Sequence, residues 1–259
     1  MPRPPFPSAR PVATDKSSPR HGLARVLSKR GLCSRSQAEQ WIRAGRVSVD
    51  GRTVRDPYQP TWIDQSRIVV DGDAAEPVET VYIAFNKPRG LVVSAADERG
   101  RNTVYTALAA AELPWVGPVG RLDKASEGLL LLSNDTTWSA GITAPATHLD
   151  KTYHVQVAGQ PDAPALAAMQ TGISDDGELL KARQAKLLRA GEKNAWLEVV
   201  LDEGRNRHIR RLLAALGFDV LRLIRVAIGP LPLGDLAKGQ WRRLSVDEVQ
   251  SLDVRRHKS

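Results

Sequence analysis

The 259-residue sequence has one cysteine, few aromatic residues and no apolar run long enough to cross a membrane. The single thiol of Cys33 excludes an internal disulfide and argues against a cysteine-based zinc site, and the five histidines are too scattered to suggest another metal centre. Neither a glycine-rich phosphate loop nor a Ser-His-Asp spacing is recognisable. The Pro- and Arg-rich start lacks the apolar segment of a secretory signal. We therefore expect a cytoplasmic protein that uses no metal, no cofactor and no membrane segment.

Positive charge is present in excess, and it is concentrated near the N-terminus. The net charge is +8 and the isoelectric point is near 9.9, which is typical of a protein with a polyanionic partner. Residues 1–72 hold 13 Lys and Arg against 6 Asp and Glu, whereas residues 73–259 hold 24 against 23. This imbalance predicts a separate basic module in the first quarter of the chain. The hydrophobic fraction of 42% is sufficient for packed cores.

Composition and turn signals divide the chain into four parts. We predict a disordered basic tail over residues 1–20, a basic binding module over 21–72, a linker over 73–79 and a larger domain over 80–259. The tail is rich in Pro, Ser and Arg and has no apolar periodicity. The linker is short, so we expect it to join the two folded parts flexibly.

The basic module reads as two helices followed by a small hairpin sheet. Apolar residues at helical spacing begin at Leu23, and Ser36 with Glu39 has the spacing of a capping box, which predicts that Ser36 opens the second helix. Asp50-Gly51 lies between two short alternating segments and predicts a tight hairpin turn. Cations along this module offer phosphate contacts, which position a nucleic acid without reading its bases. The candidate RNA-binding residues are Arg25, Lys29, Arg30, Arg35, Arg43 and Arg46.

The module resembles the S4 RNA-binding domain, and the resemblance is what favours RNA over DNA, because charge alone does not distinguish them. The phrases that carry it are Arg25-Val26-Leu27, Gly31, Ser34-Arg35, Gly45-Arg46-Val47 and Val49-Asp50-Gly51.

The most informative stretch is Gly120-Arg121-Leu122-Asp123-Lys124-Ala125-Ser126-Glu127-Gly128, followed by four leucines and Ser133-Asn134-Asp135. A short apolar run between turn signals predicts a buried strand. Asp123 therefore lies on a loop at the edge of a core, where burial and a neighbouring cation tune a carboxylate for chemistry. The alternative is an ordinary turn or capping aspartate. The whole stretch resembles the catalytic motif of the ribosomal RNA pseudouridine synthases, in the branch of the small-subunit enzyme and its large-subunit relatives.

Three further motifs resemble the same family. They are Asn86-Lys87-Pro88-Arg89-Gly90, Lys151-Thr152-Tyr153, and Gly204-Arg205-Asn206-Arg207-His208-Ile209-Arg210-Arg211. The resemblance implies that Asp123 is the nucleophile, that Tyr153 faces the target base and that Arg210 pairs with Asp123. His208 stands where the family pattern has glutamine. The cations expected to contact RNA in this domain are Lys87, Arg121, Arg205, Arg207 and Arg211.

Together these features predict an α+β protein, with an S4 domain followed by a catalytic domain built on a mixed, largely antiparallel sheet. We expect a monomer that isomerises uridine in ribosomal RNA, free or in a pre-ribosomal particle, with a slight preference for the large subunit. The reaction needs no redox change and no group donor, which fits a chain without cofactor motifs. In the strand expected over residues 221–230, we expect the basic side chains to face outward.

Two alternatives remain at this stage. The chain could be a non-catalytic RNA-binding or ribosome-assembly protein on the same scaffold, or a nucleoside hydrolase that uses Asp123. The first predicts no isomerisation, and the second predicts free uracil as a product.

Overall fold

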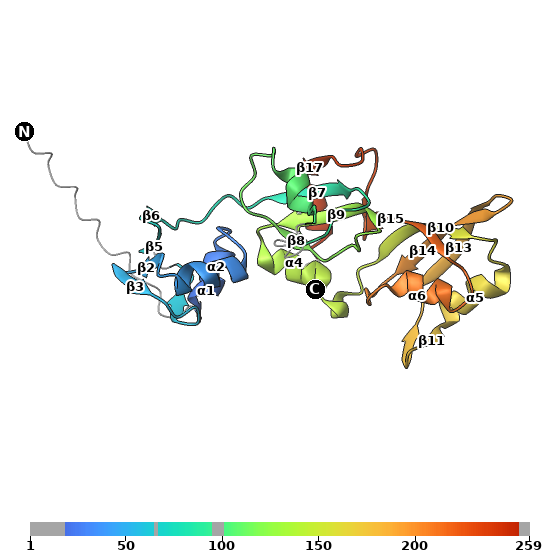
Figure 1. Cartoon of the computed structure of the whole chain (residues 1–259), viewed down its shortest axis with the longest axis horizontal. Coiled ribbons are helices and arrows are strands. Elements are labelled where there is room, and N and C mark those ends of the chain that lie inside the picture. The colour runs from blue at the N-terminus through green and yellow to red at the C-terminus, as the bar shows by residue number, and fades with distance from the viewer. Residues whose placement is uncertain (1–18, 65–66, 95–100, 254–259) are drawn as a thin grey trace, which may run out of the picture. The chain divides into compact units, whose positions relative to one another are not determined.

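The computed structural model describes residues 19–64, 67–94 and 101–253, and the chain divides into two compact units, residues 1–79 and residues 80–259 (Figure 1). Residues 1–18 of the predicted basic tail lie outside the described residues. Within the described part, each unit has its own core of buried apolar side chains. The units are therefore described separately.

The first unit contains two helices and short strands around one core. Leu23, Val26 and Leu27 of the first helix are fully buried and pack against Ala38 and Ile42 of the second. The hairpin turn at Asp50-Gly51 has positive φ at both positions, as a tight turn of this kind requires. Its elements are β1 (Arg20–Gly22), α1 (Leu23–Lys29), α2 (Arg35–Arg43), β2 (Val47–Val49), β3 (Arg52–Val54), β4 (Pro60–Trp62), β5 (Ile68–Val70) and β6 (Asp73–Ala74).

Two expectations for this unit were wrong in detail. Helix α2 is capped by Ser34, whose side chain accepts from the Gln37 backbone N–H, and not by Ser36, which lies inside the helix. The segment expected to be a linker begins in the sheet, because β6 folds back on β5 and Ala75 is buried in the core.

The second unit is organised on one nine-stranded sheet, in the order β13-β14-β10-β15-β9-β7-β17, with β16 and β8 pairing at β15 and β9. All its strand pairs are antiparallel except β9 with β15. The predicted α+β class with a mixed, largely antiparallel sheet is thus confirmed. The strands of this sheet are β7 (Tyr82–Lys87), β8 (Gly117–Val119), β9 (Glu127–Ser133), β10 (Lys151–Ala158), β13 (Gln184–Ala190), β14 (Asn194–Leu201), β15 (Val220–Ile228), β16 (Leu231–Pro232) and β17 (Trp241–Arg243). Strands β11 (Ile173–Asp175) and β12 (Glu178–Leu180) form a separate two-stranded sheet.

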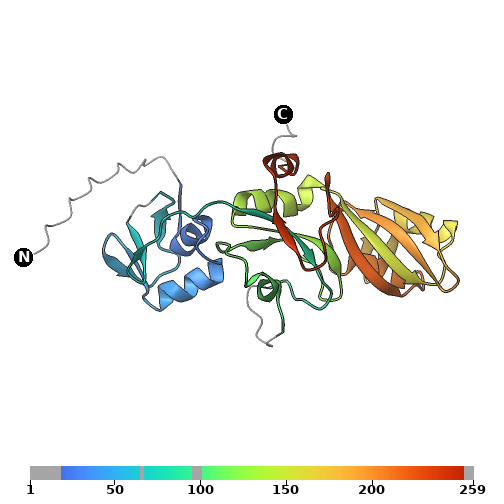
Figure 2. The same cartoon turned by 90° about the horizontal axis from the view of Figure 1, so that it is seen from above.

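Strand β9 is the predicted leucine strand, and every one of its residues is buried. Its leucines alternate between two cores, because successive side chains of a strand point to opposite faces. Leu130 and Leu132 pack with α3, whereas Leu129 and Leu131 pack with α4 and α7. Figure 2 shows these helices on opposite sides of the strands. Their bounds are α3 (Val104–Leu108), α4 (Thr136–Thr143) and α7 (Val246–Ser251), with a short 3-10 helix at Pro145–Thr147.

The other half of the sheet is covered on one face by α5 (Ala163–Thr171) and α6 (His208–Ala214). Val155 and Val157 of β10 and the odd-numbered residues of β14 from Ala195 to Leu201 form its core with these helices. The two halves are joined at the parallel pairing of β9 with β15, which comprises only Ile224 with Glu127 and Arg225 with Gly128.

The approach of the two chains at this join requires a glycine. At Gly128 φ is +99°, and a Cβ atom there would lie 2.3 Å from the Arg225 carbonyl oxygen and 2.8 Å from its backbone nitrogen. No side chain fits at this distance. The glycine that follows the predicted catalytic loop thus sets how closely the two halves of the sheet meet.

Candidate active site

A buried lysine, Lys87, holds the loop that carries Asp123 through backbone hydrogen bonds. The side chain of Lys87, at the end of β7, is fully buried. Its Nζ donates to the carbonyl oxygens of Asp123 at 3.1 Å, Ser126 at 2.8 Å and Pro88 at 3.2 Å. Burial lowers the pKa of Lys87 to about 8, although the charges of Asp123 and Glu127 oppose that shift. The lysine therefore positions the loop through backbone carbonyls, and the Asp123 side chain itself is half-buried.

Tyr153 lies on β10, with Lys151 two residues before it and so on the same face of the strand. In the sheet Tyr153 is paired with Val199 on one side and with Arg225 on the other. Its half-buried ring packs against the cores of both halves of the unit.

Arg210 lies in the first turn of α6. Its guanidinium donates from Nη1 to the carbonyl oxygen of Val220 at 3.2 Å and from Nη2 to that of Ala125 at 3.4 Å. The structure contains no ion pair within 4 Å between Arg210 and Asp123, both of which are described. The two groups nevertheless interact electrostatically: burial and the neighbouring Arg207 lower the pKa of Arg210, and Asp123 acts in the opposite direction.

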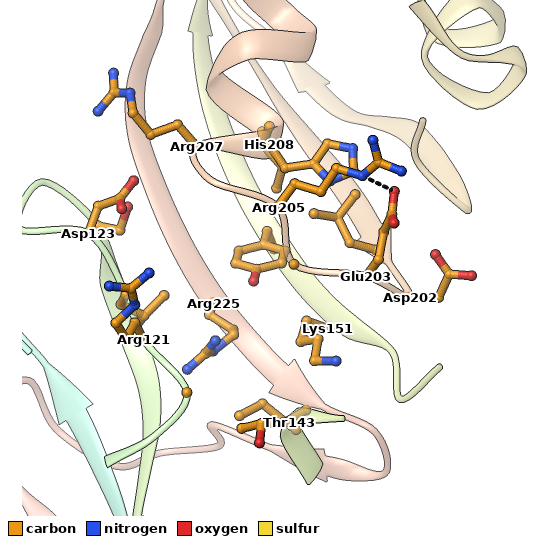
Figure 3. A pocket seen from close by; sticks show the side chains of 18 of the residues that line it. Arg121, Asp123, Thr143, Lys151, Asp202, Glu203, Arg205, Arg207, His208 and Arg225 are labelled. Atoms are coloured by element: carbon orange, nitrogen blue, oxygen red, sulfur yellow. Dashed lines mark ion pairs between the residues drawn. The ribbon is translucent and has the colours of Figure 1, made fainter. Parts of the chain in front are cut away.

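Asp123, Tyr153 and Arg210 line one pocket of about 330 Å³. The loop from β8 to β9, strands β10 and β15, and the segment leading into α6 supply its walls (Figure 3). Arg121, Arg205 and Arg207, three of the predicted RNA-binding residues, line it as well. A second hollow, lined by Val92, Arg101, Arg121, Asp123 and Arg207 among others, adjoins the same loop, so Asp123 lies between two cavities.

The segment before α6 has a backbone conformation that is uncommon for arginine. Arg207 has φ of +49° and ψ of +31° and immediately precedes the helix, in the left-handed region that few non-glycine residues adopt. Its side chain is exposed. The helix begins at His208, so the four arginines of the motif are divided: Arg205 and Arg207 lie in the loop, and Arg210 and Arg211 lie in the helix.

Several predicted RNA-binding residues are placed differently from our expectation. Lys87 is buried under the loop, and Arg30 is 5% exposed and donates to the carbonyl oxygens of Ile63 and Ala75, so neither side chain is accessible from the surface. Arg211 is engaged by Asp175 and Glu178, each at 2.5 Å. These three residues support the fold instead.

The other predicted cations of the first unit have exposed or half-buried side chains. Arg25 is exposed and Lys29 contacts His21 at 3.2 Å. Arg35 and Arg43 both pair loosely with Glu39 on α2, and such exposed pairs leave the cations available to solvent. Arg46 pairs with Asp71 and lies over the Trp41 ring.

Two cations that line the pocket, Lys151 and Arg225, were not among the predicted site residues. Lys151 could have been found, because it lies two positions before Tyr153 on a strand and therefore shares its face. Arg225 contradicts the expectation that the basic residues of its strand face outward, because it is 5% exposed and lines the pocket. His208, the departure from the family pattern, is also buried at the pocket, and burial lowers its pKa, which favours the neutral ring.

The described residues include no cluster of three or more His, Cys, Asp or Glu side chains that could hold a metal ion. Over the same residues, no helix combines the length and the apolar character that a membrane crossing requires.

Comparisons with known proteins identify relatives of both units of the chain. The model of a family described as RNA pseudouridylate synthase matches residues 81–215, and that of the S4 domain matches residues 22–60. The chain is 37% identical over 225 residues to an uncharacterised RNA pseudouridine synthase of Rickettsia prowazekii, covering 86% of this chain and 94% of that protein. It is 36% identical over 235 residues to the ribosomal large subunit pseudouridine synthase B of Bacillus subtilis, covering 89% and 94%. A crystal structure of a pseudouridylate synthase matches 91% of this chain and 100% of its own, with 31% identity and a TM-score of 0.64.

Proposed function

This chain belongs to the RNA pseudouridylate synthase family, and from that premise we propose that it converts uridine to pseudouridine in ribosomal RNA. Asp123 is the nucleophile, Tyr153 lies against the target base, and Arg210 is the cation that pairs with Asp123. The observation that carries this proposal is that the three side chains, which are far apart in the sequence, line one pocket.

The reaction breaks the bond between C1′ of the ribose and N1 of uracil, and it forms a bond from C1′ to C5. The Asp123 carboxylate attacks either C1′ or the base, which releases or labilises the glycosidic bond, and the uracil then turns over in the pocket. C5 then bonds to C1′, and the bond between Asp123 and the substrate breaks, which regenerates the carboxylate. The C5 proton leaves last to a carboxylate beside it, and N1, which has lost its bond to C1′, takes up a proton. Atoms and electrons balance within the one nucleotide, so no co-reactant is needed.

Two observations support Arg210 as the partner of Asp123: its charge and its hydrogen bond to the loop that carries Asp123. Its guanidinium bonds the carbonyl of Ala125, two residues after Asp123, and it interacts electrostatically with the carboxylate. Catalytic hydrogen bonds are often long in ligand-free enzymes and tighten when substrate binds. A uridine in the pocket would exclude water between the two side chains and strengthen their attraction. Tyr153 supplies an aromatic surface on which an extruded base can stack.

RNA is the expected substrate because cations surround the pocket and the first unit belongs to the S4 type. We propose ribosomal RNA, with the large-subunit 23S RNA preferred, since the Bacillus subtilis relative carries a large-subunit name.

The test is to map pseudouridines in ribosomal RNA from cells with and without the protein, and then to assay the Asp123→Asn variant on the RNA that changes. The variant removes the nucleophile and keeps its shape, so the rate should fall at least about 10⁴-fold while RNA binding is retained. Asp176→Asn is the matched control. Asp176 is exposed in the β11–β12 turn with φ of +50°, which asparagine tolerates.

Each alternative has its own outcome. Undiminished isomerisation by Asp123→Asn would overturn the assignment of the nucleophile. Unchanged pseudouridine maps together with RNA binding would favour a non-catalytic assembly protein, and release of free uracil would favour a hydrolase.

A further inference from the structure

Two cations, Lys151 and Arg225, line the part of the pocket next to Tyr153. Tyr153 is paired across the sheet with Arg225, and Lys151 shares its strand face. Figure 3 shows Arg225 between Arg121 and Lys151. Nothing in the chemistry assigned to the nucleophile and its partner uses these two cations.

The Arg225 guanidinium is buried, and only part of its hydrogen-bonding capacity is used. Its side chain is 5% exposed, and Nε donates to the carbonyl oxygen of Leu129 at 2.7 Å. Nη2, however, is buried with no hydrogen-bond partner among the described residues. A buried cationic donor without an acceptor is costly. The pocket that it lines is the place from which an acceptor could come.

Lys151 makes the same region more positive. In the described part of the chain its ammonium has no ion pair within 4 Å, and burial together with the charge of Arg225 lowers its pKa. The carboxylates of Asp150 and Asp202 oppose that shift, but both are engaged elsewhere. Asp150 pairs with Arg183 at 2.9 Å, and Asp202 lies 3.5 Å from a ring nitrogen of His148.

The excess of positive charge extends through the pocket. Six Lys and Arg side chains line it against three carboxylates, and one of those carboxylates, Glu203, pairs with Arg205 at 3.1 Å. An anionic ligand would therefore balance the excess positive charge of the pocket and supply an acceptor for Arg225 Nη2. In RNA the anionic group next to every base is the backbone phosphate, and arginine and lysine are the side chains that bind it.

We propose that Arg225 and Lys151 form a phosphate subsite that binds the backbone phosphate adjoining the uridine whose base lies against Tyr153. This inference rests on the proposed function, because the RNA and the extruded uridine come from it. The subsite would hold the nucleotide by its phosphate while the uracil is detached and turns. The adjoining phosphate is the one on the 5′ or on the 3′ side of the nucleoside, and the experiment distinguishes the two.

The experiment is an NMR titration of the full chain, with ¹⁵N-labelled arginine, against uridine, uridine 5′-monophosphate and uridine 3′-monophosphate. One of the monophosphates should bind at least about tenfold tighter than uridine, because charge-assisted hydrogen bonds are the strong ones. It should also move the Arg225 side-chain signals. In Lys151→Met this preference should fall to less than about threefold. Lys193→Met, which removes an exposed lysine in the β13–β14 turn outside the pocket, should keep it.

Arg225→Gln is the second variant, since its amide can still donate to the Leu129 carbonyl while the charge is lost. It too should lose the preference. Equal binding of uridine and both monophosphates would show that the acceptor is the base or the ribose and would overturn the subsite. No measurable binding by either monophosphate, or a preference that survives in both pocket variants, would also overturn it. None of these readouts depends on turnover, so a failed subsite and a failed isomerase assignment are distinguished by assaying the wild type on RNA separately.

Discussion

The ammonium group of Lys87 lies 3.1 Å from the backbone carbonyl oxygen of Asp123, underneath the loop that presents the carboxylate to the pocket. The interaction is with the backbone, so it fixes the path of the chain and leaves the carboxylate oxygens available for chemistry. A charged donor that bonds three carbonyls at once makes this loop rigid.

Lys87→Met should therefore lower kcat on RNA by about 10²-fold, because displacing a reacting group by about 1 Å costs that much. The dissociation constant for RNA should change by less than about threefold, since the side chain is fully buried. Single-turnover kinetics and a binding titration separate the two effects. Lys193→Met removes an exposed lysine outside the pocket and serves as the control. A wild-type kcat in a folded Lys87→Met protein would contradict the positioning role.

Gly128→Ala should prevent the two halves of the second unit from joining normally. The added Cβ would meet the Arg225 carbonyl at 2.3 Å, so the unfolding free energy should fall by about 3 kcal/mol or more. Gly90→Ala is the matched control: its φ of +101° is nearly the same as the +99° of Gly128, but no atom lies within 4 Å of the added Cβ. It should lose only the cost of backbone strain, about 1 kcal/mol. Urea unfolding measures both, and equal losses would contradict the steric argument.

Glu127→Gln should make stability less dependent on pH below neutrality. Arg222, and after it Lys238, hold the pKa of the buried Glu127 carboxyl down at about 2, whereas its ordinary value is 4.5. Because the folded-state pKa is lowered, the ionised carboxylate stabilises the fold above about pH 4.5, and this stabilisation disappears as the pH falls towards 2. The variant should be less stable than wild type by about 2 kcal/mol at pH 7, after allowance for the exposed cations.

The difference between Glu127→Gln and wild type should shrink towards zero near pH 2, which thermal unfolding across pH would reveal. Glu192→Gln, at an exposed turn, should follow the wild-type curve. A stability difference that does not depend on pH would show that the ion pairs are not its source.

Arg207→Asn should weaken RNA binding and leave stability nearly unchanged. The backbone is left-handed at this position, which asparagine tolerates better than arginine, while the exposed cation at the pocket is lost. The slope of log K against log salt should decrease in magnitude by about one. Arg211→Gln should keep the slope, because Asp175 and Glu178 already engage the charge of Arg211. Equal slopes for wild type and Arg207→Asn would exclude a phosphate contact.

The sequence was sufficient for the elements whose signal is local. Four consecutive leucines between turn signals predicted β9, and Tyr153, Val155 and Val157 alternate in β10 as residues on one face of a strand do. The placement of Asp123 on a loop at the edge of the core followed from the same pattern. The S4 module and the pseudouridine synthase domain, both predicted from motifs, are confirmed by the family matches.

The residues whose environment was predicted wrongly make contacts with segments that are distant in the sequence. Lys87 and Arg30 are buried because carbonyls from segments more than 30 residues away converge on them, and no local pattern reports that. Arg222 and Arg225 share a strand, yet one pairs with Glu127 and the other enters the pocket. The pairing of β15 with β10 is irregular next to Arg225, which a regular alternation would not predict.

The join between β9 and β15 has a consequence for how the protein can fail. Asp123 precedes one side of this two-pair join, and Tyr153 and Arg210 belong to the other side. A slip of one residue there would place Glu127 or Leu129, instead of Gly128, against Arg225, where no side chain fits, and it would turn the leucines of β9 to the wrong faces. The same glycine that lets the two halves meet therefore rejects the misaligned register. A chain that closes at this join also has its nucleophile aligned with the base.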